Sequence, residues 1–487
     1  MLIRLVSLVV CGLGIVLSGC ATNPVTGKSN FVMLSEEQEL KIGREADDDV
    51  KKRFGVYDDK ELNDYVQRVG QRLAEQSHRP GLIYRFTVLD TPDVNAFALP
   101  GGYIYITRGL MAYLNSEAEL AGVLGHEIGH VTARHGVRQY SAAQAAGIGY
   151  TIGTILVPEL AGQGARSLFS VLSTSLLSGY GRKHELESDR LGAQYLARSG
   201  YDPQAMLEVI GVLKNQEVAA KEIAEKEGRE ANTYHGVFST HPDNDQRLQE
   251  VIAEAGKVEA SDSPYQGRQE YIDQIDGLVF GDSPSQGVRR GRYFYHQELD
   301  FKLAFPEGWR TNNLPDRVDS SPRENDAILQ VTMTDRNRQV SPLVFISKRL
   351  KQSKLQQARE MTINGFKVGT GVGKMTTPFG YKATRIIVLY DGDRAFMFFG
   401  ATKGTDLSKY DDDFLATARS FDRLSEEDRG YAKGLRISVV KASSSDNIEA
   451  LAKRSPLNKY PEVQLRLLND LYPSGEPKPA QLLKMIE

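Results

Sequence analysis

Two histidines lie four residues apart in the segment His126-Glu127-Ile128-Gly129-His130. Residues at that spacing share one face of a helix, so both imidazoles can bind the same ion while Glu127 lies next to it. Neutral imidazoles suit zinc, which they bind at about 2.0 to 2.1 Å, and a zinc site needs a third protein ligand. The segment therefore predicts a zinc site with a carboxylate beside the metal.

Glu185 and Asp189 can complete this site, because they are also four residues apart on a predicted helix that ends near Gly200 and Pro203. One carboxylate can bind the metal while the other accepts a hydrogen bond from a ligating histidine and fixes its tautomer. Taken alone, an acidic pair on a helix is usually surface charge. Beside the two histidines it becomes a candidate for the metal site, and the spacing leaves open which carboxylate is the ligand.

Two further histidines flank these motifs. His135 follows His130 by five residues, on another face of a helix that we expect to run to Gly136, so we expect His135 to face solvent or to cap the helix. His184 precedes Glu185, and adjacent helical residues point about 100° apart. Neither histidine is predicted to bind the metal.

The elements that must position these residues are mainly helical. Capping boxes at Ser35 and Ser116 predict two helices, the second of which carries the paired histidines, and residues 61–76 predict another. Residues 84–89 and 103–106 are rich in β-branched and aromatic residues, which predicts strands of a small sheet.

Two segments differ from this pattern in composition. Residues 139–158 carry no charge and form either a membrane-dipping hairpin or a helical excursion in water. Small and polar side chains gain little free energy on transfer from water into a membrane, which favours the helical excursion in water. Residues 257–291 contain runs of Ser, Pro, Asp and Gly and are predicted to be a linker or docking loop.

Residues 292–424 are predicted to form an α+β sheet domain. The turn Pro306-Glu307-Gly308-Trp309 resembles the opening of PsbP-like domains, and Asp391-Gly392-Asp393 predicts a hairpin turn. The apolar periodicity predicts strands at 301–305, 327–333, 343–347, 383–390 and 395–401, and helices at 354–366 and 411–421.

Residues 432–487 are predicted to run strand, helix, helix, strand, over 435–441, 447–453, 461–471 and 481–486. This order resembles a LysM module, which implies peptidoglycan binding. LysM modules usually have a Gly-Asp turn after the first strand, and this chain has Ser445-Asp446 there. Glycan binding and a purely structural role therefore both stay open.

The N-terminus has the features of a secretory signal over residues 1–19, with Arg4 followed by an apolar run. Leu17-Ser18-Gly19-Cys20 resembles the lipobox of bacterial lipoproteins, which implies that Cys20 is acylated and anchors the protein to a membrane. A plain signal peptide or a single anchor helix is the alternative. The residue after Cys20 is Ala rather than Asp, which resembles the pattern sent to the outer membrane.

Composition excludes several classes of protein. With 40% hydrophobic and 25% charged residues among 487, the chain is not mainly disordered. The 60 basic residues nearly balance the 63 acidic ones, so we expect no nucleic-acid partner. The two cysteines both lie in the first twenty residues, so no disulfide is expected in the folded part.

Together the motifs resemble the zinc metallopeptidase family of CAAX prenyl endopeptidases and HtpX-type proteases, metallopeptidase family forty-eight, in its soluble outer-membrane lipoprotein branch. The resemblance rests on the order of four motifs, Asn95-Ala96-Phe97-Ala98, the His126 helix, Glu185-x-x-x-Asp189 and Ser239-Thr240-His241-Pro242. It implies a mainly helical gluzincin-type domain with a small β-sheet over residues 20–256. The expected fold class of the whole chain is α+β.

The resemblance also implies roles for single residues. It places one zinc ion per chain on His126, His130 and Glu185, with Glu127 as the catalytic base. It implies that residues 95–98 form an edge strand that pairs with extended substrate, although these residues could simply be core. His241 either occupies the position of the zinc-bound water at rest or stabilises the oxyanion, and Arg247 matches an arginine of the cleft.

The resulting hypothesis is a lipid-anchored zinc endopeptidase of the bacterial cell envelope, at the outer membrane and facing the periplasm. Its expected substrates are unfolded or misassembled envelope proteins. The alternative is an envelope chaperone or assembly scaffold that uses the same domain to bind clients. Under either hypothesis the C-terminal modules can contact peptidoglycan or envelope proteins.

Overall fold

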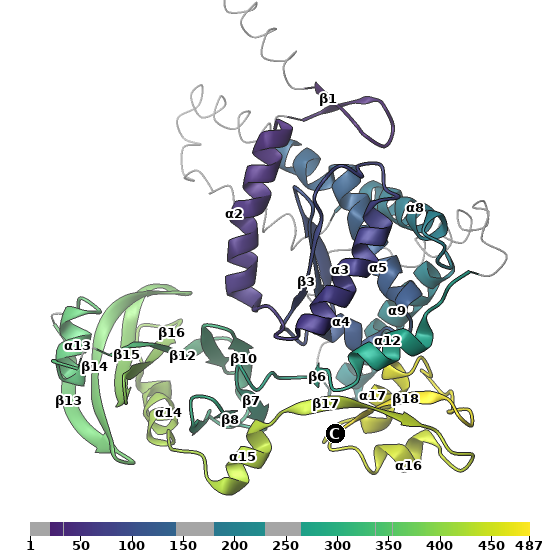
Figure 1. The fold of residues 1–487 in the computed structure, drawn as a ribbon. Coiled ribbons are helices and arrows are strands. Elements are labelled where there is room, and N and C mark those ends of the chain that lie inside the picture. Colours follow the sequence, from purple (N-terminus) through teal and green to yellow (C-terminus); the bar gives the residue numbers. More distant parts are fainter. Residues whose placement is uncertain (1–19, 33, 143–179, 229–263, 337, 353) are drawn as a thin grey trace, which may run out of the picture. The chain divides into compact units, whose positions relative to one another are not determined.

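The computed structural model describes residues 20–32, 34–142, 180–228, 264–336, 338–352 and 354–487 (Figure 1). The chain divides into two compact units, one of residues 1–51, 55–280 and 436–487, the other of residues 52–54 and 281–435. Both units combine helices and sheets, which confirms the predicted α+β class. Among the described residues, no helix is both long and apolar enough to cross a membrane.

The first unit is mainly helical and contains three small sheets. Its described helices are α2 (Glu36–Phe54), α3 (Lys60–Ala74), α4 (Arg108–Tyr113), α5 (Glu117–Thr132), α8 (Arg182–Arg198), α9 (Ala205–Lys226), α12 (Arg268–Ile275), α16 (Ile448–Ala452) and α17 (Pro461–Leu468). Its strands are β1 (Cys20–Thr22), β2 (Ser29–Phe31), β3 (Arg85–Leu89), β4 (Ala96–Leu99), β5 (Tyr103–Thr107), β6 (Val279–Phe280), β17 (Leu435–Lys441) and β18 (Leu482–Ile486).

The two predicted helix starts are confirmed. At α2, Ser35 Oγ accepts from the backbone N–H of Gln38, whose side chain accepts from Ser35 N in return. At α5, Ser116 Oγ accepts from the N–H of Glu119 at 3.1 Å, but the Glu119 carboxylate accepts from Asn115 N at 2.8 Å. The side-chain caps satisfy N–H groups that have no partner inside the helix, which is why both helices begin here.

The small sheet has the strand order β3-β5-β4, with β3 parallel and β4 antiparallel to the central strand. All five residues of β5 are buried, as expected for a central strand covered on both faces. In the described part of the chain β4 pairs only with β5, so β4 is an edge strand. Helix α5 packs against β4.

The segment predicted as a linker contains regular structure where it is described. Helix α12 buries Tyr271, whose hydroxyl donates to the carbonyl of Met111 at 2.6 Å. Strand β6 extends the C-terminal sheet, which has the order β18-β17-β6. The linker prediction is corrected for residues 264–280, because Tyr271, Ile272, Ile275, Leu278 and Val279 are buried in the first unit.

The C-terminal strand-helix-helix-strand order is present in β17, α16, α17 and β18, and apart from Leu435 these four elements belong to the first unit. Lys484 of β18 is buried, and its Nζ donates to the carbonyls of Ala112 and Leu114 at 2.8 and 2.7 Å. Tyr113 donates to Gln464 of α17 at 3.1 Å. The module therefore packs on the C-terminal end of α4 and on the start of the loop that leads into α5.

The second unit contains a seven-stranded antiparallel sheet in the order β10-β11-β12-β16-β15-β14-β13 and a three-stranded sheet in the order β7-β8-β9. Its helices are α13 (Pro342–Lys348), α14 (Ser408–Arg419) and α15 (Glu426–Ala432). Its strands are β7 (Val288–Arg290), β8 (Tyr293–His296), β9 (Phe301–Ala304), β10 (Arg310–Leu314), β11 (Arg317–Ser321), β12 (Ala327–Asp335), β13 (Gln356–Ile363), β14 (Phe366–Thr377), β15 (Gly380–Asp391) and β16 (Arg394–Thr402).

Two of the predicted elements of this unit are wrong in type. Residues 343–347 form helix α13 instead of a strand, because Ser341 caps the helix and Pro342 occupies its first turn. Residues 354–366 contain the edge strand β13 instead of a helix. Asn364 and Gly365 both have positive φ and join β13 to β14 by a two-residue loop, and this pairing outweighs local helix propensity.

Candidate metal centre

Helices α5 and α8 pack closely side by side and together carry the candidate ligands (Figure 1). A Cβ added to Gly129 of α5 would be 3.0 Å from the Cα of Ser188, and one added to Gly192 of α8 would be 3.0 Å from the backbone N of His126. Larger side chains would force the helices apart. The glycines therefore bring the two sequence motifs into contact.

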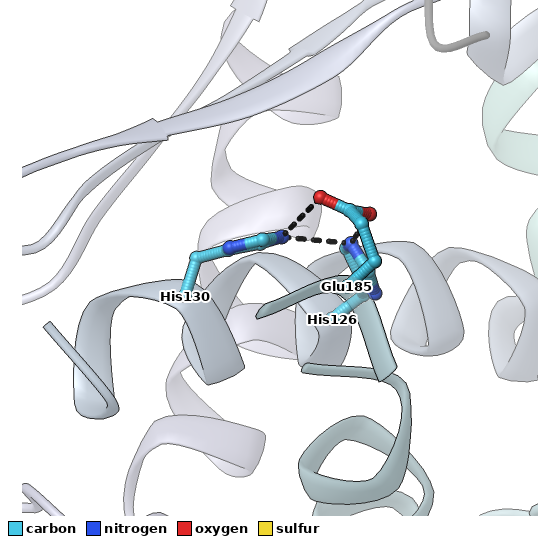
Figure 2. A group of neighbouring side chains, drawn as sticks. All are labelled: His126, His130 and Glu185. Carbon is cyan, nitrogen blue, oxygen red and sulfur yellow. Dashed lines mark hydrogen bonds and ion pairs between the residues drawn. The ribbon is translucent and has the colours of Figure 1, made fainter. Parts of the chain in front are cut away.

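The three predicted zinc ligands form one buried cluster, in which both imidazoles point at the carboxylate (Figure 2). His126 Nε2 and His130 Nε2 are 3.0 Å apart. The Glu185 carboxylate oxygens are 3.5 Å from His126 Nε2 and 3.6 Å from His130 Nε2. One ligand atom from each residue lies within 4.8 Å of the others.

This donor set fits zinc in composition and spacing. A tetrahedral ion with bonds of about 2.0 to 2.1 Å keeps neighbouring ligand atoms about 3.3 Å apart, close to the separations of this cluster. Two histidines and a glutamate leave a fourth position for water or substrate, as in catalytic zinc sites. The residues present therefore fit a catalytic zinc ion.

Asp189 lies behind the first ligand. His126 Nδ1 donates to Asp189 Oδ1 at 2.8 Å, and both side chains are buried. This hydrogen bond leaves the lone pair of His126 on Nε2, the atom that faces Glu185. The structure thus separates the two carboxylates of the predicted pair. Glu185 faces the Nε2 atoms of the histidines, whereas Asp189 orients His126 from behind.

Glu127 is buried and borders an apolar pocket beside the cluster. The pocket is small, with a cavity volume of about 30 Å³, and its walls come from α5, α9, α4 and β4. Its lining residues are Ala96, Leu110, Gly122, Val123, His126, Glu127, Met206, Val209, Ile210 and Leu213. Of the predicted substrate strand, Asn95 precedes β4, Ala96 lines this pocket, Phe97 stacks on Tyr105, and Ala98 is buried.

The expectation that His135 faces solvent or caps the helix is wrong. His135 is fully buried, its Nδ1 is 2.9 Å from His130 Nδ1, and its Nε2 is 3.1 Å from Glu187 Oε2. Burial lowers the pKa of His135, whereas the hydrogen bond from His135 lowers the pKa of Glu187 to about 2. The helix ends at Thr132, before the expected Gly136, so the spacing rule for a continuous helix does not apply to His135.

Aromatic rings enclose the outer side of the cluster. Tyr180 stacks on His130 with ring centroids 4.1 Å apart, and His184 stacks on His135 at 4.3 Å. Burial lowers the pKa of His184 to about 4 and raises that of Tyr180. His184 is not in the ligand group, which agrees with its expected direction.

Other sequence predictions fall outside the described residues. These predictions concern His241, Arg247, the signal segment 1–19 and most of the uncharged segment 139–158. Cys20 is described as the first residue of β1, where its backbone pairs with Phe31.

Comparison with protein families gives a match to Peptidase family M48 over residues 60–255. The matched segment includes both helices of the metal centre and the edge strand β4.

Individual relatives resemble about half of the chain. A beta-barrel assembly-enhancing protease of Yersinia pestis is 29% identical over 257 residues, which cover 51% of this chain and 50% of the relative. The mitochondrial metalloendopeptidase OMA1 of Arabidopsis thaliana is 28% identical over 225 residues, 46% of this chain and 42% of the relative. The chain thus spans about half the length of the curated relatives it matches.

Among solved structures, cyanobacterial PsbP from Synechocystis sp. PCC 6803 is similar at 12% identity and a TM-score of 0.23. The similarity covers 28% of this chain and 94% of that structure.

Proposed function

We propose that the protein is a zinc-dependent endopeptidase, because residues 60–255 match Peptidase family M48. The observation that carries the proposal is the buried cluster of His126, His130 and Glu185 directly beside Glu127. Two imidazoles and a carboxylate at zinc-ligand spacing, next to a second carboxylate, are the groups that peptide hydrolysis by activated water requires.

Zinc bound in the cluster would lower the pKa of a water molecule towards neutrality and polarise the scissile carbonyl. Glu127 takes the proton of the attacking water and delivers it to the leaving amine nitrogen. Asp189 accepts the hydrogen bond from His126 Nδ1 and so fixes the tautomer and the orientation of that imidazole. The surrounding apolar residues exclude bulk water from these proton transfers.

The edge strand β4 is the proposed substrate-binding strand. Its outer edge offers backbone N–H and C=O groups to an extended peptide, which can add to the sheet as a further strand. Ala96 lies in the wall of the pocket that Glu127 also borders, so a peptide on β4 would run beside the candidate base. Such backbone recognition favours extended, unfolded segments over folded proteins.

We further propose that the substrates are unfolded or misassembled proteins of the bacterial envelope. The similarity to a beta-barrel assembly-enhancing protease supports this substrate class. Recognition through an edge strand supports it independently, because a folded protein rarely exposes an unpaired extended segment.

Metal removal tests the proposed activity. The zinc-loaded full chain is expected to cleave a permanently unfolded, carboxymethylated protein, and chelation should reduce cleavage at least about 100-fold because activation of water is lost. Adding one equivalent of zinc should restore the rate, which gel electrophoresis and mass spectrometry of the fragments can follow. Equal cleavage by the metal-free and zinc-loaded protein would rule out a zinc peptidase.

The apolar pocket predicts the preferred residue next to the scissile bond. Gly122→Val is expected to fill the pocket, because even a Cβ at this position lies 3.3 Å from Met206 Sδ. Cleavage beside leucine or phenylalanine should fall about 10- to 200-fold, whereas cleavage beside alanine should change little. A peptide series that varies this single residue measures the effect.

Gly211→Val is the matched control, because a Cβ added to Gly211 on α9 would have no atom of the described residues within 4 Å. The specificity of this control variant should equal that of the wild type. An equal loss with all peptides in Gly122→Val would indicate general damage and argue against a specificity pocket.

A lipid anchor at Cys20 is the proposed means of membrane attachment. Cys20→Ser is expected to leave an unprocessed precursor or a protein in the wrong compartment, because serine cannot carry the thioether-linked lipid. Fractionation of the envelope and metabolic labelling with a fatty acid measure this. Zinc content and peptidase activity of the purified variant should be unchanged, and normal outer-membrane fractionation would contradict the anchor.

A further inference from the structure

A chain of hydrogen bonds runs from His130 away from the metal-binding cluster. The Nδ1 atoms of His130 and His135 are 2.9 Å apart, and His135 Nε2 donates to Glu187 Oε2 at 3.1 Å. Arg138 donates to the same carboxylate oxygen at 3.3 Å. The side chains of His130 and His135 are 1% and 0% exposed, so water does not compete with the bond between them.

One arrangement of protons satisfies this chain and leaves His130 able to bind a metal ion. The Glu187 carboxylate accepts, so His135 Nε2 carries a proton and His135 Nδ1 is the acceptor. His130 Nδ1 must then donate, which puts the lone pair of His130 on Nε2, the atom that faces Glu185. The reverse arrangement would place a proton on His130 Nε2 and prevent coordination.

The Ser188 hydroxyl is compatible with this assignment, since it lies 3.4 Å from His135 Nδ1 and can donate to an acceptor there.

We propose that His135, held by Glu187, is a positioning residue that keeps His130 in the tautomer that presents Nε2 to zinc. This inference rests on the proposed zinc site. It makes the two ligating histidines equivalent, because each then donates its second N–H to an outer partner, Asp189 for His126 and His135 for His130. Such outer partners fix the ligand orientation and raise its basicity.

The backbone carries His135 to this position by a specific turn. Arg134 adopts a left-handed φ of 58°, which is unfavourable for a residue other than glycine and ends the regular course of α5. The Arg134 guanidinium is 2.8 Å from the buried carboxylate of Glu39 on α2, which also bonds Arg79 at 2.9 Å. This buried ion pair holds the turn, and on a continuous helix His135 would point about 140° away from His130.

A purely structural role is the competing explanation, because His135 also belongs to a stack of rings. Its ring centroid is 4.3 Å from that of His184 and 5.8 Å from that of Tyr180. His184 is the matched control, since it contributes a ring to the same stack but does not belong to the ligand group.

The test measures zinc affinity of the full chain by competition with a chromophoric chelator. His135→Leu is expected to weaken zinc binding about 10- to 100-fold, because His130 loses its outer acceptor. His135→Asn should recover most of this loss, since its Oδ1 can accept from His130 Nδ1. Glu187→Ala should cause an intermediate loss, and His184→Leu should bind as the wild type does.

Cobalt provides a second readout that does not depend on activity. The visible absorption bands of Co²⁺ in the site should shift in His135→Leu and return in His135→Asn, because they report the ligand field of the coordinating imidazole. A structural defect alone would lower the melting temperature of the metal-free protein without this pattern.

Unchanged zinc affinity in both His135 variants would overturn the inference, as would equal losses in His135→Leu and His184→Leu. If His135→Leu does not fold, an unchanged affinity and cobalt spectrum in Glu187→Ala and His135→Asn would overturn it instead. A wild-type protein that binds no zinc contradicts the proposed function itself, whereas a zinc-binding wild type with unaffected variants contradicts only the role of His135.

Discussion

Glu127→Gln is expected to lower the rate of peptide hydrolysis about 10²- to 10⁴-fold, because glutamine has the same size but cannot accept the proton of the attacking water. Glu127 lies outside the group of His126, His130 and Glu185, so the variant should still bind one zinc ion. Turnover of a fluorogenic peptide and zinc content measured by atomic absorption on the same sample check both statements.

The same variant separates the two functional hypotheses. A protease loses its effect in cells when Glu127 is changed, whereas a chaperone or scaffold that uses the domain to bind clients should retain it. Glu45→Gln is the control, because Glu45 is an exposed residue of α2 and loses the same charge. Full complementation by Glu127→Gln would favour the chaperone, and proteins retained by the inactive variant would identify the substrates.

Glu185→Ala is expected to abolish stoichiometric zinc binding. Glu185 is the one carboxylate in the buried ligand group, and without it the two imidazoles cannot complete a three-ligand site. Zinc added at about 100 times the dissociation constant stabilises a folded protein by about 2.7 kcal/mol, so this stabilisation should disappear in the variant. Thermal unfolding with and without zinc measures it.

Asp189→Asn is the matched comparison, because asparagine can still accept from His126 Nδ1. Its zinc affinity should fall by only about 10- to 100-fold, the usual effect of changing an outer partner. Glu185→Ala with one zinc ion retained would refute the ligand assignment. If Asp189→Asn instead lost the metal and Glu185→Ala kept it, the two carboxylates would have the opposite roles.

Predictions from sequence succeeded where neighbouring residues determine the structure. The capped starts of α2 and α5 depend on contacts between residues three or four apart, and these are confirmed. The types of α13 and β13 are predicted wrongly, because Ser341-Pro342 and the Asn364-Gly365 loop decide them against the propensity of the longer run. Asn-Gly between two apolar residues is a sequence signal for a hairpin turn. The spacing of the apolar residues in the longer segment predicted a helix instead.

For the metal centre too, some features can be predicted from the sequence and others depend on the tertiary structure. The spacing of His126 and His130, and that of Glu185 and Asp189, follows from the helical repeat and can be read directly from the chain. Their mutual distance, the place of Ala96 beside Glu127 and the contact of His135 with His130 depend on tertiary packing.

The physical reason is the range of each interaction. A helical repeat relates residues within a few positions, so it predicts which side chains share a face but not which helix faces them. Gly129 and Gly192 allow α5 and α8 to approach, and the ion pair of Arg134 with Glu39, 95 residues earlier in the chain, turns the backbone so that His135 reaches His130. These contacts join distant parts of the chain, and only the folded structure brings them together.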